Sequence, residues 1–241
     1  MLYTLPSPVI FAHRGASAHA PENTLAAFEL ALQQGADAIE LDVKLSADGI
    51  PVVIHDPTVD RTTDGSGTVS NLSLAALKEL DAGEGQKIPT LDEVFSTVGG
   101  KILINVELTN YKTRDDQLVD KVVEVVKKHN LAEKIIFSSF LPKNLTRAAE
   151  LLPQTPRGLL ALPNLLGWFV RNILFKRGNY QALHPELRDA RKKSIASTHR
   201  MGRRVHVWTV NKAEDMRRLA DWGVDGIFTD DPELALKIFR K

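Results

Sequence analysis

The sequence predicts a (β/α)8 barrel, the TIM-barrel fold class, and two observations lead to it. Eight short β-branched runs alternate with longer segments of helical period. The chain has 241 residues, close to the roughly 250 that such a barrel needs. This length is enough for one large hydrophobic core, so we expect a single domain over residues 1–241. A doubly wound sheet seldom alternates strand and helix so regularly.

The eight predicted strands are short runs rich in Val, Ile, Leu and aromatic residues. In chain order they cover residues 9–13, 38–43, 102–108, 134–139, 157–161, 180–184, 204–208 and 225–229. The segments between them carry apolar residues at helical spacing, as in Leu25, Phe28 and Leu32. Thr90 and Glu93 have the spacing of a capping box, which predicts a helix start. Further helices are expected over 115–129, 187–201, 212–222 and 232–239.

An insertion of about residues 46–88 interrupts this alternation after the second strand. Asp48-Gly49 separates two apolar runs, which is a hairpin signal, and Asp64-Gly65-Ser66-Gly67 marks a further loop. Insertions at the top of a barrel commonly shape the active site. We therefore expect residues 46–88 to contribute to the functional site.

The composition excludes several classes of protein. Lys plus Arg is 31 against 30 for Asp plus Glu, so no global field favours nucleic acid or an anionic membrane. There is no cysteine, which excludes thiolate zinc sites and a cysteine nucleophile. The N-terminus lacks the features of a signal peptide and no apolar run reaches transmembrane length, so a cytoplasmic location is expected.

Three carboxylates form a candidate metal site. Glu40 and Asp42 lie two residues apart on the second strand, so the pleat points both to one side, and Glu107 ends the next barrel strand. Three buried carboxylates repel one another unless a cation neutralises them. Oxygen ligands suit Mg²⁺ or Ca²⁺. The alternative is that each carboxylate forms a salt bridge, for which Lys44 is the nearest partner.

Two histidines are candidate catalysts. His13 ends the first strand beside Arg14, and His55 lies in the insertion within VVIHDP. If the insertion folds back over the second strand, both imidazoles flank a phosphate held at the carboxylates. One would accept a proton from the attacking hydroxyl group and the other would protonate the leaving oxygen. The alternative for each histidine is a structural hydrogen bond.

Arg14 and Trp208 are candidate substrate-binding residues. The guanidinium of Arg14 suits two phosphate oxygens, although it would also suit an ion pair with a neighbouring acid. Trp208, at the end of the seventh strand, suits either a wall of the pocket or a filler of the barrel. Phe140 and His184 also follow strands and are weaker candidates for lining the site.

The motifs resemble those of the glycerophosphodiester phosphodiesterase family. They are AHRGASAHAPENTLAAF, GADAIELDVKLSADGIPVVIHDPTVDRTTDG, INVELTN, and HVWTVN with GVDGIFTDDP, spread over about residues 9–236. The resemblance implies a TIM barrel that uses Ca²⁺ or Mg²⁺ to hydrolyse glycerophosphodiesters to glycerol 3-phosphate and an alcohol. It implies the same roles for His13, His55, Arg14 and the three carboxylates.

One position departs from the family pattern. Many members carry a lysine two residues after the third carboxylate, where this chain has Thr109. We expect this change to alter affinity or substrate choice rather than abolish the chemistry, with Lys112 as one replacement. Two alternative functions remain open: a phospholipase D-like hydrolase of lysophospholipids or sphingolipids, and a non-catalytic binding barrel. The intact histidines and carboxylates weigh against the second.

Residues 162–177 have the pattern of an amphipathic helix with basic neighbours. The apolar residues, from Leu162 to Leu174, recur at helical spacing, and Arg171, Lys176 and Arg177 lie among or after them. An interfacial helix that contacts lipid is one interpretation. We favour the other, an outer barrel helix that buries its apolar stripe against the strands or in a dimer.

Overall fold

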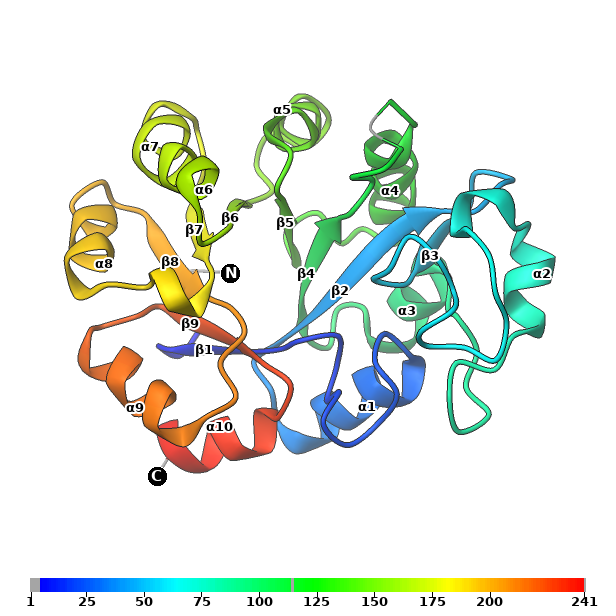
Figure 1. Cartoon of the computed structure of the whole chain (residues 1–241), viewed down its shortest axis with the longest axis horizontal. Coiled ribbons are helices and arrows are strands. Elements are labelled where there is room, and N and C mark those ends of the chain that lie inside the picture. The colour runs from blue at the N-terminus through cyan, green and yellow to red at the C-terminus, as the bar shows by residue number, and fades with distance from the viewer. Residues whose placement is uncertain (1–4, 114, 241) are drawn as a thin grey trace.

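The computed structural model describes residues 5–113 and 115–240, and within them eight parallel strands close into a barrel (Figure 1). β1 pairs with both β2 and β9, which joins the two ends of the sheet. The predicted TIM-barrel fold is therefore confirmed. The barrel strands are β1 (Val9–Ala12), β2 (Ala38–Leu45), β4 (Leu103–Leu108), β5 (Ile135–Ser139), β6 (Arg157–Ala161), β7 (Ala182–Pro185), β8 (Arg204–Val207) and β9 (Gly226–Thr229).

A ring of helices surrounds the strands (Figure 1). They are α1 (Leu25–Gln34), α3 (Leu91–Val98), α4 (Leu118–Lys128), α5 (Pro142–Leu151), α6 (Leu165–Phe169), α7 (Phe175–Arg177), α8 (Lys192–His199), α9 (Ala213–Asp221) and α10 (Pro232–Phe239). The Thr90 hydroxyl accepts the amide of Glu93 and the Glu93 carboxylate accepts the amide of Thr90, so the predicted capping box is present at the start of α3. None of the described helices is long and apolar enough to cross a membrane.

The segment between β2 and α3 contains the extra strand β3 (Pro51–Val53), the 3₁₀ helix η2 (Val69–Asn71) and helix α2 (Leu74–Glu79). β3 pairs antiparallel with β2, with Val43 opposite Val53, as the hairpin signal at Asp48-Gly49 predicts. Gly49 has φ +75°, a backbone conformation that favours glycine in such a turn. The pairing turns the chain back along β2 towards the upper rim of the barrel.

Two expected helices differ from the structure. The helix predicted over 187–201 is instead the 3₁₀ turn η4 (Leu187–Asp189) followed by α8, because the amide of Leu187 bonds to the carbonyl of Trp208 at the end of β8. The segment 162–177 is not one regular helix. It divides into α6, the π-helical turn η3 (Val170–Leu174) and α7.

The interior of the barrel changes from apolar to polar along β4. On β4, Leu103, Asn105 and Glu107 alternate with Ile104 and Val106, which pack against the outer helices. Leu103 belongs to an apolar cluster with Phe11 and Phe228 inside the barrel. The inward face of β4 therefore begins with the apolar Leu103 at the bottom of the barrel and ends with the carboxylate of Glu107 at the carboxyl end of the strand.

Candidate active site

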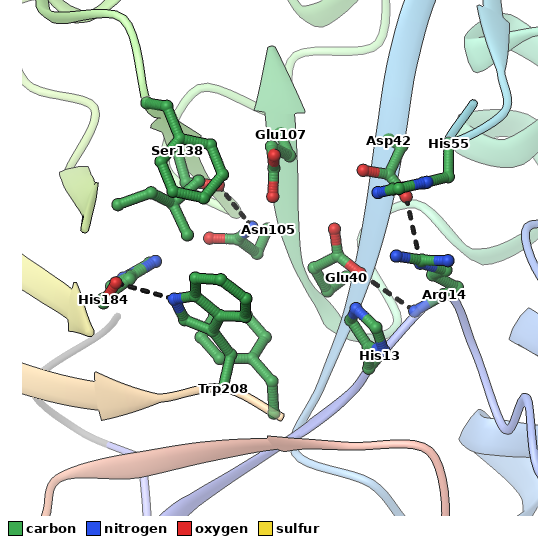
Figure 2. Close-up of a pocket in the computed structure, with 13 residues that line it drawn as sticks. His13, Arg14, Glu40, Asp42, His55, Asn105, Glu107, Ser138, His184 and Trp208 are labelled. Atoms are coloured by element: carbon green, nitrogen blue, oxygen red, sulfur yellow. Dashed lines mark hydrogen bonds and ion pairs between the residues drawn. The ribbon is translucent and has the colours of Figure 1, made fainter. Parts of the chain in front are cut away.

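A pocket of about 420 Å³ opens at the carboxyl ends of the strands, where TIM-barrel enzymes carry out their chemistry (Figure 2). Phe140 and His184, the weaker candidates from the sequence, also line it. The structure brings all of the predicted site residues to this one pocket: His13, Arg14, Glu40, Asp42, His55, Glu107 and Trp208.

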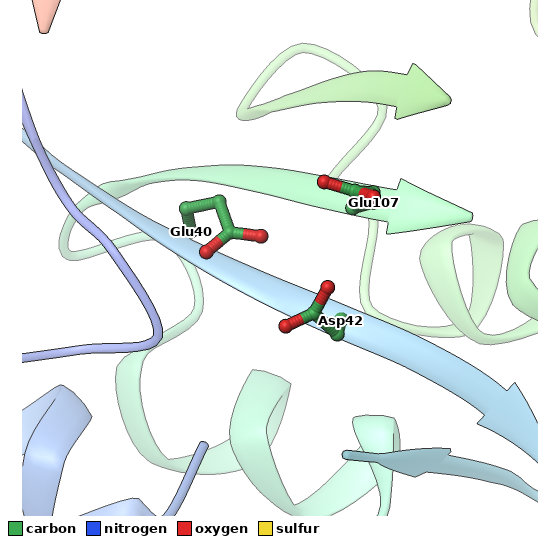
Figure 3. Close-up of side chains that lie close together, drawn as sticks. All are labelled: Glu40, Asp42 and Glu107. Atoms are coloured by element: carbon green, nitrogen blue, oxygen red, sulfur yellow. The ribbon is translucent and has the colours of Figure 1, made fainter. Parts of the chain in front are cut away.

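The three carboxylates Glu40, Asp42 and Glu107 face one another across β2 and β4 (Figure 3). Each offers an oxygen atom, and these atoms all lie within 4.8 Å of one another. The strand register explains this contact, because Asp42 is directly opposite Glu107. Each group is also held by the protein, through the Arg14 amide to Glu40 (2.9 Å), the Asn23 side-chain amide to Asp42 (3.0 Å) and the Tyr111 hydroxyl to Glu107 (2.7 Å).

Burial and mutual repulsion disfavour the charged form of this cluster. Burial, and then the charge of Asp42, raise the pKa of Glu107 to about 8. The pKa of Glu40 is also well above its usual range, mainly through burial and then through Asp42 and Glu107. A divalent cation at the centre would remove this penalty. The cluster is therefore able to bind a cation.

Arg14 connects the carboxylates to a network of charges at the rim. Its guanidinium donates to Glu22 (2.9 Å) and lies 3.4 Å from Asp42. Burial opposes its charge, but Asp42, Glu40 and Glu22 more than offset this and raise the pKa of Arg14. Arg14 has φ +59° and Gly15 has φ +85°, so the chain turns sharply after β1. A side chain at Gly15 would meet Ala27 of α1 at 2.6 Å, which explains the glycine.

His13 is held by a carboxylate that directly follows the last strand of the barrel. Its Nδ1 lies 2.7 Å from Asp230 Oδ1, just beyond β9. Although burial opposes it, hydrogen bonds from His13, Asn211 and Ser17 lower the pKa of Asp230, so this carboxylate is ionised near neutral pH. An ionised carboxylate only accepts hydrogen bonds, so Nδ1 carries the proton and Nε2 remains for the pocket.

His55 has the same arrangement and lies beside Asp42 (Figure 2). Its Nδ1 lies 2.6 Å from Asp56 Oδ1. A hydrogen bond from Arg61 is the main cause that lowers the pKa of Asp56 to about 2. The β2–β3 hairpin brings His55 here, because the amide of Ile54 bonds to the carbonyl of Asp42. The carboxylate cluster is thus flanked by two histidines, each oriented by an aspartate.

Comparisons with known proteins agree with this geometry. The model of the glycerophosphoryl diester phosphodiesterase family matches residues 13–234. The chain belongs to this family. A glycerophosphodiester phosphodiesterase of Caldanaerobacter subterraneus subsp. tengcongensis is 40% identical, over 97% of this chain and 98% of the relative. An Oleispira antarctica phosphodiesterase, solved in complex with sn-glycerol-3-phosphate, is 33% identical and has a TM-score of 0.88, with 100% and 99% of the two chains covered.

Membership of the glycerophosphoryl diester phosphodiesterase family makes the chain a phosphoric diester hydrolase, and the enzyme class expected from its motifs is confirmed. A third similar protein has the same fold. It is a putative glycerophosphoryl diester phosphodiesterase of Silicibacter pomeroyi, with a TM-score of 0.87, 26% identity and 98% and 94% of the two chains covered.

Lys44 is a residue near the site whose position was not anticipated from the family pattern. It follows Glu40 and Asp42 on the same face of β2. Its ammonium group donates to the carbonyl (2.9 Å) and hydroxyl (2.7 Å) of Thr109, the position where many family members have lysine. Lys112, the replacement considered from sequence, is exposed. Lys44 therefore places a half-buried ammonium group beside Thr109.

An aromatic wall closes the side of the pocket opposite the carboxylates. The indole of Trp208 donates to the carbonyl of His184 (2.7 Å) and meets the Phe140 ring edge-on, with centroids 5.7 Å apart. Trp208 thus lines the pocket, and it also packs on the apolar cluster inside the barrel. Below it, burial lowers the pKa of His184 to about 3 and that of His206 well below its usual range. These two imidazoles are neutral near pH 7 and contact each other at 3.1 Å.

The sequence did not reveal the partners that orient the catalytic candidates. Asp56 stands next to His55, so the dipeptide His55-Asp56 was an available signal. Asp230 follows the last strand, where a polar residue faces the rim of a TIM barrel. Tyr111 had no comparable signal, because it reaches Glu107 from a loop. Orienting residues of this kind act through another side chain and so lack a motif of their own.

Proposed function

We propose that this protein hydrolyses glycerophosphodiesters to glycerol 3-phosphate and an alcohol, with a divalent cation at Glu40, Asp42 and Glu107 and with His13 and His55 as acid and base. The observation that carries this proposal is the carboxylate cluster between two aspartate-held histidines. The Oleispira relative, whose structure contains sn-glycerol-3-phosphate, supports the substrate class.

The proposed cation is Mg²⁺ or Ca²⁺. The three carboxylates supply only hard oxygen ligands, and the chain contains no cysteine that would favour a softer metal. When bound, such an ion supplies positive charge that stabilises the developing charge on the phosphoryl oxygens. Water or a neighbouring glycerol hydroxyl group is the nucleophile, and the second would give a cyclic phosphate before the final product.

The protein's own residues supply proton transfer and orientation. Asp230 and Asp56 hold Nδ1 of the two imidazoles, which leaves Nε2 of each ring for the substrate. One ring accepts the proton of the nucleophile and the other donates a proton to the leaving oxygen. Arg14 contributes a fixed positive charge on the phosphate side, and Trp208 packs against the glycerol or alcohol portion.

The first experiment measures glycerol 3-phosphate released from glycerophosphocholine and glycerophosphoethanolamine, and lysophosphatidic acid released from a lysophospholipid. Each substrate is incubated with Mg²⁺, Ca²⁺ or EDTA. We expect release from a glycerophosphodiester that requires the cation and is lost in Asp42→Asn. Release that persists in EDTA would contradict the role of the metal. Release from neither glycerophosphodiester with either cation would overturn the proposed substrate class, and formation of lysophosphatidic acid from the lysophospholipid alone would favour the phospholipase D-like alternative.

Lys44 is expected to strengthen phosphate binding in place of the lysine that Thr109 lacks. We expect Lys44→Met to raise KM by about fivefold, with a smaller effect on kcat, because a nearby positive charge contributes on the order of 1 kcal/mol to binding an anion. Lys44→Arg should retain most of the affinity. The matched control is Lys112→Met, which removes an exposed lysine of the same rim. A rise in KM for Lys112→Met alone would assign the role to Lys112.

A further inference from the structure

Exposed apolar side chains gather on one short segment after β6. We call this segment the α6 patch, and its members are Leu165 (89% exposed), Leu166 (65%), Trp168 (56%), Phe169 (43%) and Leu162 (39%). Among the described residues, the other large apolar side chain exposed to this degree is Ile50 (36%). The expectation that the stripe of 162–177 packs against the strands is therefore wrong for the α6 patch, although it holds for Val170. Apolar patches of this kind mark interaction sites.

The α6 patch is held in place by the structure beneath it. The Asn164 side chain caps α6 by accepting the amide of Gly167 (2.8 Å). Arg171 donates to the carbonyl of Leu162 (2.7 Å) and forms an ion pair with Asp189 of η4 (2.6 Å). These contacts fix α6 with its apolar side chains outward. The exposed leucines and aromatic rings therefore belong to an ordered segment that hydrogen bonds and an ion pair hold in place.

The α6 patch lies at the rim from which the active-site pocket opens. Leu160 of β6 lines the pocket, and Leu162 follows it two residues later, just beyond the strand. Figure 1 places α6 directly after β6, on the same side of the barrel as α7 and α8. A surface that covers the α6 patch would therefore adjoin the mouth of the pocket.

Positive charge accompanies the α6 patch. The stretch 171–204 has ten Lys and Arg against two acidic residues, although the whole chain is nearly balanced. Both acids are paired, Asp189 with Arg171 and Glu186 with Arg188. Four exposed basic residues lie in η4 and at the start of α8, close to the Arg171–Asp189 ion pair: Arg188, Arg191, Lys192 and Lys193. The partner is therefore expected to carry negative charge.

We propose that the α6 patch docks on an anionic lipid surface, a role that goes beyond hydrolysis in the pocket. Apolar side chains flanked by Lys and Arg are the features of a segment that lies in a membrane interface. Trp168 and Phe169 suit the boundary between head groups and acyl chains. Lys192 and Lys193, exposed at the start of α8, would attract the lipid phosphates. Docking between two copies would bring these positive charges together, which disfavours a dimer through the same face.

Flotation of the full chain with vesicles tests this proposal. We expect binding to phosphatidylcholine vesicles that contain phosphatidylglycerol, weaker binding to pure phosphatidylcholine, and loss of binding in high salt. Leu165→Glu and Lys193→Glu should each weaken binding, the first by about tenfold or more, because it replaces an inserted apolar side chain with a charged one. The matched controls Ile50→Glu and Lys127→Glu alter exposed residues away from the α6 patch and should bind like the wild type.

The same variants separate docking from catalysis. Leu165→Glu should release glycerol 3-phosphate from soluble glycerophosphocholine at the wild-type rate. Vesicle binding is measured without a substrate, so it still tests docking if the proposed hydrolysis is not observed. Absence of flotation with anionic vesicles overturns the proposal, as does binding that Leu165→Glu leaves unchanged. A dimer that Leu165→Glu dissociates, without vesicle binding, would also overturn it and assign the α6 patch to self-association.

Discussion

Glu107→Gln is expected to lower kcat/KM by about 10³-fold or more, because it removes a proposed ligand of the cation and its charge. In EDTA the same substitution should stabilise the protein at alkaline pH. Burial and Asp42 raise the pKa of Glu107 to about 8 in the folded, metal-free protein. The unfolded chain loses this proton near the ordinary glutamate pKa of about 4.5. The folded state thus binds more protons over this interval, and its stability falls as the pH rises from about 4.5 through 8.

Urea unfolding between pH 5 and pH 8.5 measures this effect. The wild type in EDTA should lose stability across the interval, Glu107→Gln should lose less, and saturating Mg²⁺ or Ca²⁺ should restore the wild type but not the variant. Glu133→Gln, at an exposed site outside the pocket, is the matched control. A wild-type stability in EDTA that stays constant or rises with pH would contradict the repulsion inferred for the cluster.

His13→Ala and His55→Ala are each expected to lower kcat by about 10²- to 10⁴-fold, the usual contribution of a positioned acid or base. A phosphodiester with a nitrophenol leaving group distinguishes the two roles. The leaving group of that ester departs without a proton, so the variant that lacks the acid should recover much of its activity and the variant that lacks the base should not. His129→Ala is the control, because His129 also contacts an aspartate (Asp92, 2.8 Å) but lies outside the pocket.

Two outcomes would contradict this assignment of roles to His13 and His55. Equal recovery of both variants with the activated ester would show that neither histidine acts as the base. Wild-type kcat in either variant would exclude that residue from proton transfer. Asp230→Asn adds a positioning test: the imidazole of His13 remains but loses its ionised partner. We expect a lower kcat with a shifted pH profile and little change in KM.

The local pattern of the sequence was sufficient for the fold and for one face of the site. All eight barrel strands lie within two residues of their predicted bounds, because each is an apolar run with clear breaks. The period of a strand also placed Glu40 and Asp42 on one side of β2. The capping box at Thr90 was equally local. Each of these features depends on residues at most a few positions apart, so each can be predicted from a short stretch of the sequence.

Contacts between distant residues were decided by the closure of the barrel. Asp230 lies 217 positions from His13 and reaches it because β9 pairs with β1. The ammonium of Lys44 reaches Thr109 because β4 pairs with β2. Strand register sets such contacts, and no local pattern encodes which strands become neighbours at which offset.

The α6 patch shows the same limit. The helical period of 162–177 predicted an apolar stripe, and the stripe exists. Whether it is covered depends on how the segment leaves β6, on the π-helical turn that follows, and on the ion pair between Arg171 and Asp189. The sequence determined the strands, the faces of the strands and the residue types of the site. Only the tertiary structure decided which oxygens share a cation, which aspartates hold the histidines and which apolar side chains meet solvent, because these depend on the packing of segments far apart in the chain.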